Sequence, residues 1–151
     1  MADPPISVYA LITIVAPFDN TATSESKSWK QVSNPPVLSH LKAEKYREHY
    51  LGKPESQIFR GAEWQASPLL APPEILRNCP PMLLLVAGVD IYYAEGLKFC
   101  EKVQKLDVSV ELRIYPKAVH SFMLMDAVLP SGRQGMNDMV DFLKRKIEEY
   151  S

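Results

Sequence analysis

The order of hydrophobic and polar positions predicts an α/β fold. Residues 82–87 form a continuous apolar run, which is typical of a strand buried on both faces of a parallel sheet. Residues 108–115 alternate apolar and polar side chains, the pattern of a half-buried strand. Between them, residues 93–105 place apolar side chains on one side at a spacing of three, which predicts a helix. Strand, helix and strand form a right-handed crossover, so the two strands are expected to be parallel.

The first apolar segment, residues 6–17, is rich in β-branched residues and predicts a buried central strand over 6–15. A secretory signal is the alternative reading, but Asp3 stands where a basic residue is expected. With 11 residues before Pro17, the segment is also too short to span a bilayer. We therefore expect neither a leader nor a membrane span.

Two further helices are predicted. Ser39 can cap a helix over 39–51, which Gly52 and Pro54 would end. A final amphipathic helix starts at about Gly135 and is expected to dock on the sheet through an apolar stripe. The stripe consists of Met136, Met139, Val140, Leu143, Ile147 and Tyr150.

The remaining segments read as loops. The chain from 19 to 37 is polar, and its one large aromatic residue, Trp29, is expected to be pinned onto the core. Residues 55–81 are rich in proline, which makes the backbone stiff without making it regular. Trp64 lies in this segment, and its side chain could equally line a pocket or pack into the hydrophobic core. We expect one partial domain over 1–151, with a loop and helix excursion over about 19–66.

Composition narrows the classes of function. With 151 residues, 46% of them hydrophobic, the chain is long enough to bury a core. Its net charge of −1 gives no electrostatic footprint for nucleic acid. Cys79 and Cys100 show neither a metal-ligand spacing nor a disulfide pattern, so a reducing, cytoplasmic location without a metal is expected.

Candidate chemistry follows the two predicted parallel strands. Asp90 comes just after the first and His120 just after the second, so both are expected at the same edge of the sheet. An Asp that orients a His forms the second half of a catalytic triad. Each residue alone also has a structural explanation, Asp90 as a helix cap and His120 as a hydrogen-bonded loop residue.

These motifs resemble a known family. The sequence GVDIYYAEG, then a helix, a strand ending in YP, and HSF are similar to the C-terminal half of the hormone-sensitive-lipase-like α/β hydrolases. Ser67-Pro68-Leu69 resembles another motif of that family, and the likeness covers residues 67–125. The resemblance implies an esterase or lipase acting on carboxylic esters without a cofactor. It assigns Asp90 as the triad acid and His120 as the base.

The sequence departs from the family pattern in three places. Ala94 replaces a second Asp, and Ser121 replaces the glycine after the His. No G-x-S-x-G nucleophile motif and no H-G-G-G oxyanion loop occur in the sequence. The expected fold is therefore a parallel sheet flanked by helices that resembles the C-terminal half of an α/β hydrolase and lacks the nucleophile-elbow half.

A small apolar ester is the expected substrate. Four residues are candidates for binding it: Trp64, Tyr92, Phe122 and Met123. The apolar segment 121–129 suits a substrate pocket, but it could equally begin a packed element or form an exposed patch.

Two functions of different classes remain open. In the first, the chain is part of a serine esterase whose nucleophile comes from a missing segment or a companion chain. In the second, it is a truncated relative that binds, acts as a scaffold or performs general-base catalysis without hydrolysis. A G-x-S-x-G encoded in frame upstream of Met1 would favour the first. An apolar first strand at a sheet edge would pair with other strands, so we expect a second copy or a companion chain to cover it.

Overall fold

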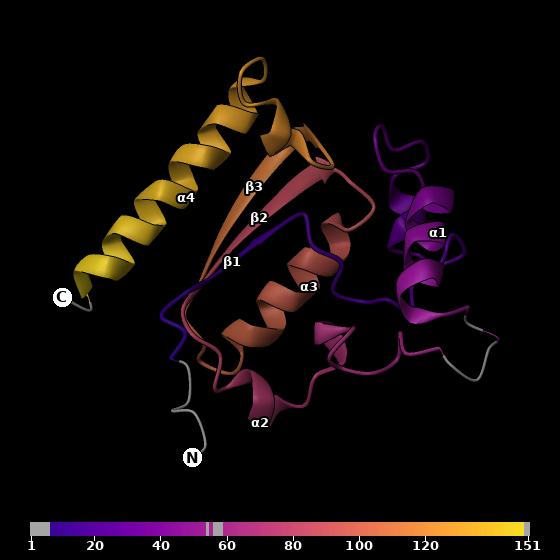
Figure 1. The fold of residues 1–151 in the computed structure, drawn as a ribbon, viewed down its shortest axis with the longest axis horizontal. Helices are drawn as coiled ribbons and strands as arrows, with labels where there is room; N and C mark the ends of the chain where they lie inside the picture. Colours follow the sequence, from indigo (N-terminus) through magenta and orange to yellow (C-terminus); the bar gives the residue numbers. More distant parts are fainter. Residues whose placement is uncertain (1–6, 54, 56–58, 150–151) are drawn as a thin grey trace.

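The computed structural model describes residues 7–53, 55 and 59–149. Three parallel strands lie in the order β1 (Leu11–Ile14), β2 (Met82–Val89) and β3 (Val110–Val119). Helix α3 (Tyr93–Gln104) covers one face of this sheet, and helix α4 (Pro130–Glu149) covers the other (Figure 1). The predicted parallel sheet flanked by helices is therefore confirmed.

Strand β2 is the centre of the core. Residues 82–87 are all buried, as the continuous apolar run predicts. Successive side chains alternate between the faces: Leu83 and Leu85 join a cluster with Phe142 of α4, while Leu84 joins another with Phe99 of α3. Burying each Leu stabilises the fold by about 1.5–3 kcal/mol.

Strand β1 differs from the prediction of a buried central strand. It has four residues and lies at the edge of the sheet, with Leu11 38% and Ile14 37% exposed. Val15 follows with a positive φ of 44°, which ends the strand. An apolar run indicates how well a strand could be buried, but the neighbours present on either side decide its position. Ile6, where the predicted strand began, lies outside the described residues.

Strand β3 continues beyond its predicted end at Tyr115. Pro116 is tolerated because β3 is the other edge strand, where a missing N–H on the open side costs no ladder bond. A Cβ at Gly88 would collide with the backbone carbonyl of Pro116, so glycine permits the close approach of β2 and β3. The register between these strands shifts after Ala87, immediately before both strands end.

Helix α1 (His40–Leu51) forms as predicted. The Ser39 hydroxyl accepts a hydrogen bond from the Lys42 N–H at 3.3 Å, and Gly52 follows the last turn. Among the described residues, four short helical segments occur in the connections. They are η1 (Trp29–Gln31), η2 (Pro68–Leu70), α2 (Pro73–Leu76) and η3 (Phe122–Met125).

Helix α4 differs from its prediction in two respects. It begins at Pro130, five residues before Gly135, because Pro suits the first helical position. Its docking residue is Phe142, which is 1% exposed, whereas much of the predicted apolar stripe faces solvent. The exposed fractions are 39% for Met136, 44% for Val140, 43% for Leu143 and 64% for Ile147. Tyr150 of that stripe lies outside the described residues.

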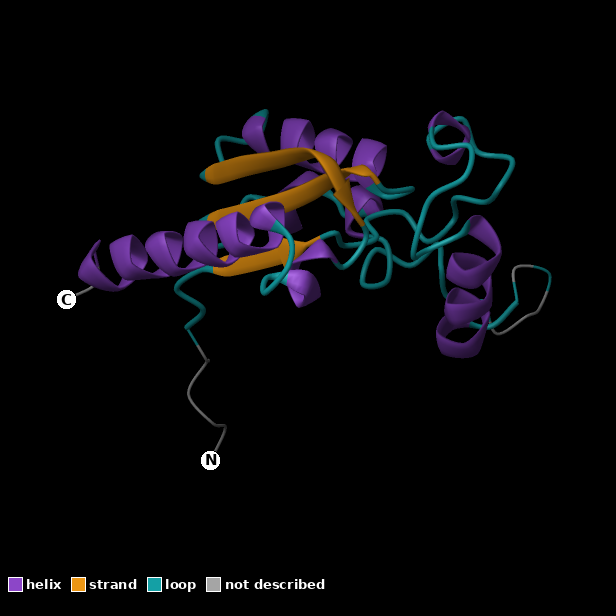
Figure 2. Ribbon diagram, turned by 90° about the horizontal axis from the view of Figure 1, so that it is seen from above, coloured by secondary structure: helices purple, strands orange, loops and turns teal. Residues whose placement is uncertain are grey.

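The described part of the excursion predicted over 19–66 lies beside the carboxyl ends of the strands, with α1 away from the sheet (Figures 1 and 2). Trp29 is 1% exposed and packs in a small cluster, so its predicted place in the core is confirmed. The cluster contains Ala22, Trp29, Leu38, Ala43 and Ile91, with Tyr92 against it. Within the part of the chain that the structure describes, the helices are all too short or too polar to cross a lipid bilayer.

Candidate active site

Asp90 and His120 meet at the carboxyl edge of the sheet. Asp90 directly follows β2 and His120 directly follows β3, and His120 Nδ1 lies 2.8 Å from Asp90 Oδ2. The other carboxylate oxygen, Oδ1, accepts the Tyr92 backbone N–H at 3.1 Å. The Asp90 side chain is 1% exposed and that of His120 21% exposed. With Nδ1 held by the carboxylate, Nε2 is the ring nitrogen left for proton transfer.

Ser121 adopts a conformation that glycine would adopt more easily. Its φ is 58°, in the left-handed region, where a Cβ costs about 1–2 kcal/mol. The chain turns at this position from the end of β3 into η3. The positive φ explains on steric grounds why a glycine after the His suits the family pattern. This chain places a Ser at that position of the turn.

A cavity of about 690 Å³ opens beside His120. It is lined by Ile14, Val15, Ala16, Pro17, Val37, Leu38, Tyr46, Tyr92, His120, Ser121, Met123 and Leu124. Apart from the imidazole and three hydroxyl groups, these side chains are apolar, and none is a carboxylate, a Lys or an Arg. A neutral, largely apolar molecule fits such walls better than a charged one.

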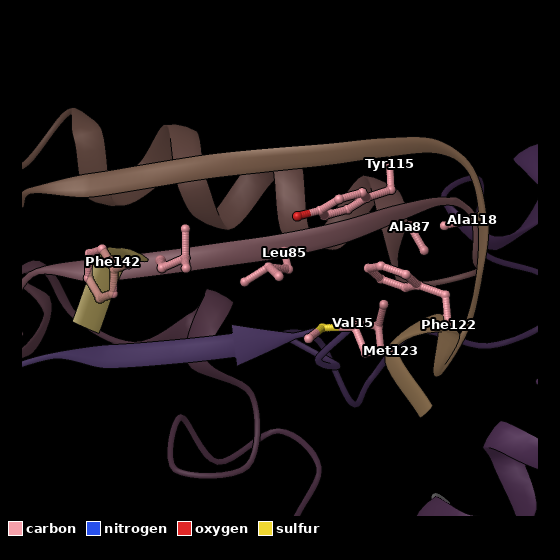
Figure 3. Close-up of a cluster of buried hydrophobic side chains, with 9 residues drawn as sticks. Val15, Leu85, Ala87, Tyr115, Ala118, Phe122, Met123 and Phe142 are labelled. Atoms are coloured by element: carbon pink, nitrogen blue, oxygen red, sulfur yellow. The ribbon is translucent and has the colours of Figure 1, made fainter. Parts of the chain in front are cut away.

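The cavity contains two of the four predicted binding residues. Tyr92 and Met123 line it, and the Tyr92 ring packs edge-on against the His120 ring with centroids 5.7 Å apart. Phe122 lies in the core instead (Figure 3). It is fully buried, and the centroid of its ring lies 4.7 Å from that of the Tyr115 ring. Trp64 is 40% exposed on a turn and is not among the lining residues.

Sequence reasoning missed Glu95, a buried carboxyl group on α3. It accepts the backbone N–H groups of Phe18 and Asp19, both at 3.0 Å, and the Trp29 indole N–H at 2.8 Å. Burial raises the pKa of Glu95 to about 7, and the three N–H donors act in the opposite direction. The available signal was its helical position, because Glu95 shares the buried face of α3 with Phe99.

Arg47 is the second buried charge that the sequence did not reveal. Its guanidinium donates to the Ala22 carbonyl and lies 5.7 Å from the centre of the Trp29 ring. Together with Glu95 it fixes the chain from 18 to 29 against the site. Trp29 in turn contacts Tyr92, with ring centroids 6.0 Å apart. Burial, followed by the charges of Glu95 and Asp90, raises the pKa of Tyr92, so its hydroxyl stays neutral.

No serine of the described chain is hydrogen-bonded to His120, whose ring has one hydrogen bond, to Asp90. Ser67, from the Ser-Pro-Leu motif, is fully buried: it donates to the Gly61 carbonyl at 2.5 Å and accepts the Asn20 N–H at 2.7 Å. Its hydroxyl therefore holds two loops together. Among the described residues, no group of three His, Cys, Asp or Glu side chains could hold a metal ion.

Comparison with known proteins defines the class. A family model described as alpha/beta hydrolase fold matches residues 2–124, and the chain belongs to this family, in its hormone-sensitive-lipase-like group. An AB hydrolase superfamily protein of Schizosaccharomyces pombe is 37% identical over 131 residues, which are 86% of this chain and 37% of that protein. An esterase of Acinetobacter venetianus is 27% identical over 132 residues, covering 87% of this chain and 41% of the esterase.

Solved structures support the same fold. An esterase from Rhizomucor miehei superimposes with a TM-score of 0.79 at 21% identity, covering 95% of this chain and 44% of that structure. The chain thus spans less than half the length of these relatives.

Proposed function

We propose that Asp90 and His120 are the acid and the base of a carboxylic-ester hydrolase whose nucleophilic serine lies outside residues 1–151. The serine and the oxyanion donors would come from an upstream segment or from a companion chain, and residues 1–151 would form one partial domain. The observation that carries the proposal is the 2.8 Å contact between Asp90 Oδ2 and His120 Nδ1 beside an apolar cavity. The two unpaired cysteines fit a cytoplasmic protein.

The proposed chemistry uses Nε2 of His120 as the base. It removes the proton from the serine hydroxyl while the serine oxygen attacks the ester carbonyl carbon. Asp90 stabilises the imidazolium that forms and keeps Nδ1 protonated. The imidazolium then gives its proton to the departing alkoxide, which leaves as the alcohol. In the second half-reaction, His120 activates a water molecule that releases the acid and restores the serine.

The apolar cavity supports a small apolar ester as the substrate. The lining residues present no fixed charge for a substrate carboxylate or ammonium group to pair with, and burying such a charge without a partner is costly. Met123 contributes a flexible side chain that can adapt to acyl or alcohol groups of different shape.

A second candidate function is favoured by the absence of a G-x-S-x-G motif from the sequence. In that case the chain retains the Asp90–His120 pair without hydrolysis and serves as a binding or scaffold protein, or as a general-base catalyst of a non-hydrolytic step. A positioned His without a nucleophile contributes about 10²–10⁴ in rate, much less than a complete triad with an oxyanion hole.

The test begins with the transcript upstream of Met1. If it encodes an in-frame G-x-S-x-G, the extended protein should hydrolyse p-nitrophenyl butyrate, and His120→Ala should lower kcat by about 10⁶. His49→Ala is the matched control, because His49 is an exposed histidine on α1. An extended protein whose esterase activity survives His120→Ala would contradict the proposal. A transcript that lacks the motif would contradict an upstream nucleophile and favour the second candidate function.

A further inference from the structure

Strained backbone conformations are concentrated at the cavity beside His120. Four non-glycine residues of the described chain have a positive φ, and three of them line this cavity: Val15 at 44°, Val37 at 70° and Ser121 at 58°. The fourth, Asp107, lies in the turn between α3 and β3 and is of a type that tolerates the left-handed region. A β-branched residue in that region is a genuine outlier. Such strain persists where the surrounding structure fixes it, and it occurs most often at functional sites.

Two of these three conformations have an explanation within the fold. Ser121 turns the chain from the end of β3 into η3. Val15 is 8% exposed, and its side chain packs in the core cluster with Leu85 and Phe122. Val37 differs from both, because none of the hydrophobic clusters among the described residues contains it. Packing in those clusters therefore does not account for its strain.

Val37 is the central residue of a tight turn that is fixed on both sides. The Leu38 N–H donates to the Pro36 carbonyl at 2.8 Å, and with the positive φ of Val37 this bond defines the rare, strained form of the γ-turn. Pro35 and Leu38 are buried, and the Lys42 ammonium group donates to the Val37 carbonyl at 3.3 Å. The inverse γ-turn, with a negative φ, makes the same hydrogen bond with less strain but directs the side chain differently. The strained form is the one that places Val37 in the cavity wall.

We propose that Val37 is a specificity-determining residue that limits the length of the apolar group the cavity accepts. Val37, Leu38 and Tyr46 form the wall that the excursion contributes, and Met123 and Leu124 belong to the wall from η3. A β-branched side chain has few rotamers, so Val37 forms a fixed boundary, whereas Met123 can adapt to the bound group. The inference rests on the proposed function and makes its substrate class narrower: neutral esters with a short apolar chain.

A rigid turn is what allows a single side chain to set such a limit. Pro35 and Pro36 fix their own φ angles, and the burial of Leu38 anchors the far side of the turn. In a flexible loop the valine would move aside for a longer chain, and no length limit would result. A boundary that cannot move instead rejects extra methylene groups, each of which changes specificity by about 10–200-fold in an apolar pocket.

Packing of Val37 against another part of the protein is the competing explanation, and it predicts a different effect on stability. The contacts that fix the turn all lie within residues 35–42, so the strain does not depend on what else borders the cavity. A packing residue stabilises the fold through its side chain. A residue kept in a strained conformation for binding lowers stability, and its replacement should remove that cost.

The first experiment measures the thermal stability of Val37→Gly in the 151-residue chain and in any extended protein. Glycine adopts a positive φ readily, so the variant should keep or raise the Tm of the chain, by up to about 4 °C. Val37→Ala retains a Cβ and should not raise it. Val128→Gly is the matched control, because Val128 is an exposed valine that neither has a positive φ nor lines the cavity. A lower Tm for Val37→Gly in either protein would identify Val37 as a packing residue and overturn the proposal.

The second experiment measures binding to the chain itself, which does not require a nucleophile. The probes are butyl methyl ketone and octyl methyl ketone, neutral carbonyl compounds that cannot be hydrolysed, and NMR titration gives their dissociation constants. Val37→Gly should increase the affinity for the octyl compound relative to the butyl compound by about tenfold. Val128→Gly should leave this ratio at the wild-type value. A ratio unchanged by Val37→Gly, or no binding of either ketone, would overturn the proposal.

Ester hydrolysis by an extended protein separates this inference from the proposed function. Val37→Gly should shift the ratio of kcat/KM for p-nitrophenyl decanoate and p-nitrophenyl butyrate about tenfold toward the decanoate. Hydrolysis with the wild-type ratio in Val37→Gly would contradict the inference and leave the proposed function intact. An extended protein that hydrolyses neither ester, although the ketones bind with a ratio that depends on Val37, would contradict the proposed function and support the length limit of the cavity.

Discussion

At the scale of single residues, two buried charges decide how the site is held. Glu95 and Arg47 fix the loop that carries Trp29, and Trp29 contacts Tyr92, which packs against His120. The helical position of Glu95 signals its burial, but its hydrogen-bond partners lie 66 to 77 positions away and are not predictable from local sequence. The Ala22 carbonyl that Arg47 contacts is likewise 25 positions away. Asp90 and His120 were predictable because each directly follows a parallel strand, which fixes the edge where both emerge.

The ionisation of Glu95 makes stability depend on pH. Its folded-state pKa of about 7 lies above the ordinary value of 4.5, chiefly because of burial, so the folded protein retains a proton that the unfolded chain releases. The free energy of unfolding should therefore fall by about 3 kcal/mol as the pH rises from below 4.5 to above 7. Denaturant unfolding at a series of pH values measures this change.

Glu95→Gln should remove that part of the pH dependence and lower stability at pH 5, because an amide offers one acceptor oxygen to three N–H donors. Glu101→Gln on the same helix is the control, since the exposed Glu101 pairs with Lys105 and lacks burial. An identical pH profile for the wild type and Glu95→Gln would contradict this assignment.

At the scale of elements, periodicity predicted β2, α3, β3 and α1 well, because it records local burial. Periodicity failed for faces of strands and helices whose burial depends on which element packs beside them. The apolar run of β1 predicted a central strand but lies at an edge, and the apolar stripe of α4 predicted docking but is largely exposed.

The start of α4 depends on close packing against η3. A Cβ at Gly132 would lie 2.7 Å from the Phe122 carbonyl oxygen, a backbone atom that cannot yield. A Cβ at Gly135 would instead meet two side chains, those of Met123 and Phe122, at the longer distance of 3.2 Å. Gly132→Ala should therefore destabilise the protein by about 2 kcal/mol despite the better helix propensity of alanine.

Gly135→Ala provides the matched comparison and should change stability by less than about 1 kcal/mol. Thermal and denaturant unfolding of both variants measure the difference. Equal effects of the two substitutions would show that backbone approach at Gly132 does not limit the packing of α4 on η3.

At the scale of the whole molecule, the described chain contains a well-buried sheet core and a more weakly anchored excursion. Strand β2 has six consecutive buried residues, whereas α1 buries Ala43, Arg47 and Leu51 in three turns. Figure 1 shows α1 away from the sheet. The excursion carries the part of the cavity wall formed by Val37, Leu38 and Tyr46, so its opening would open the cavity.

Native-state hydrogen exchange should resolve these two levels of stability. Backbone amides of α1 should exchange through an opening at least about 2 kcal/mol smaller in free energy than amides of β2. Trp29→Phe removes the indole N–H that is bonded to Glu95. It should speed amide exchange in α1 and leave exchange in β2 nearly unchanged, which increases the difference in opening free energy between the two elements. The same opening free energy and denaturant dependence for α1 and β2 would contradict this division.

The central claim is that this chain carries the acid and base of a serine hydrolase without its nucleophile. Intact-mass analysis after treatment with a fluorophosphonate, which bonds covalently to activated serines, tests it most directly. The account predicts no stoichiometric adduct on the 151-residue chain. One adduct per chain that disappears in His120→Ala would show that a serine within these residues is activated by His120, and the claim would be wrong.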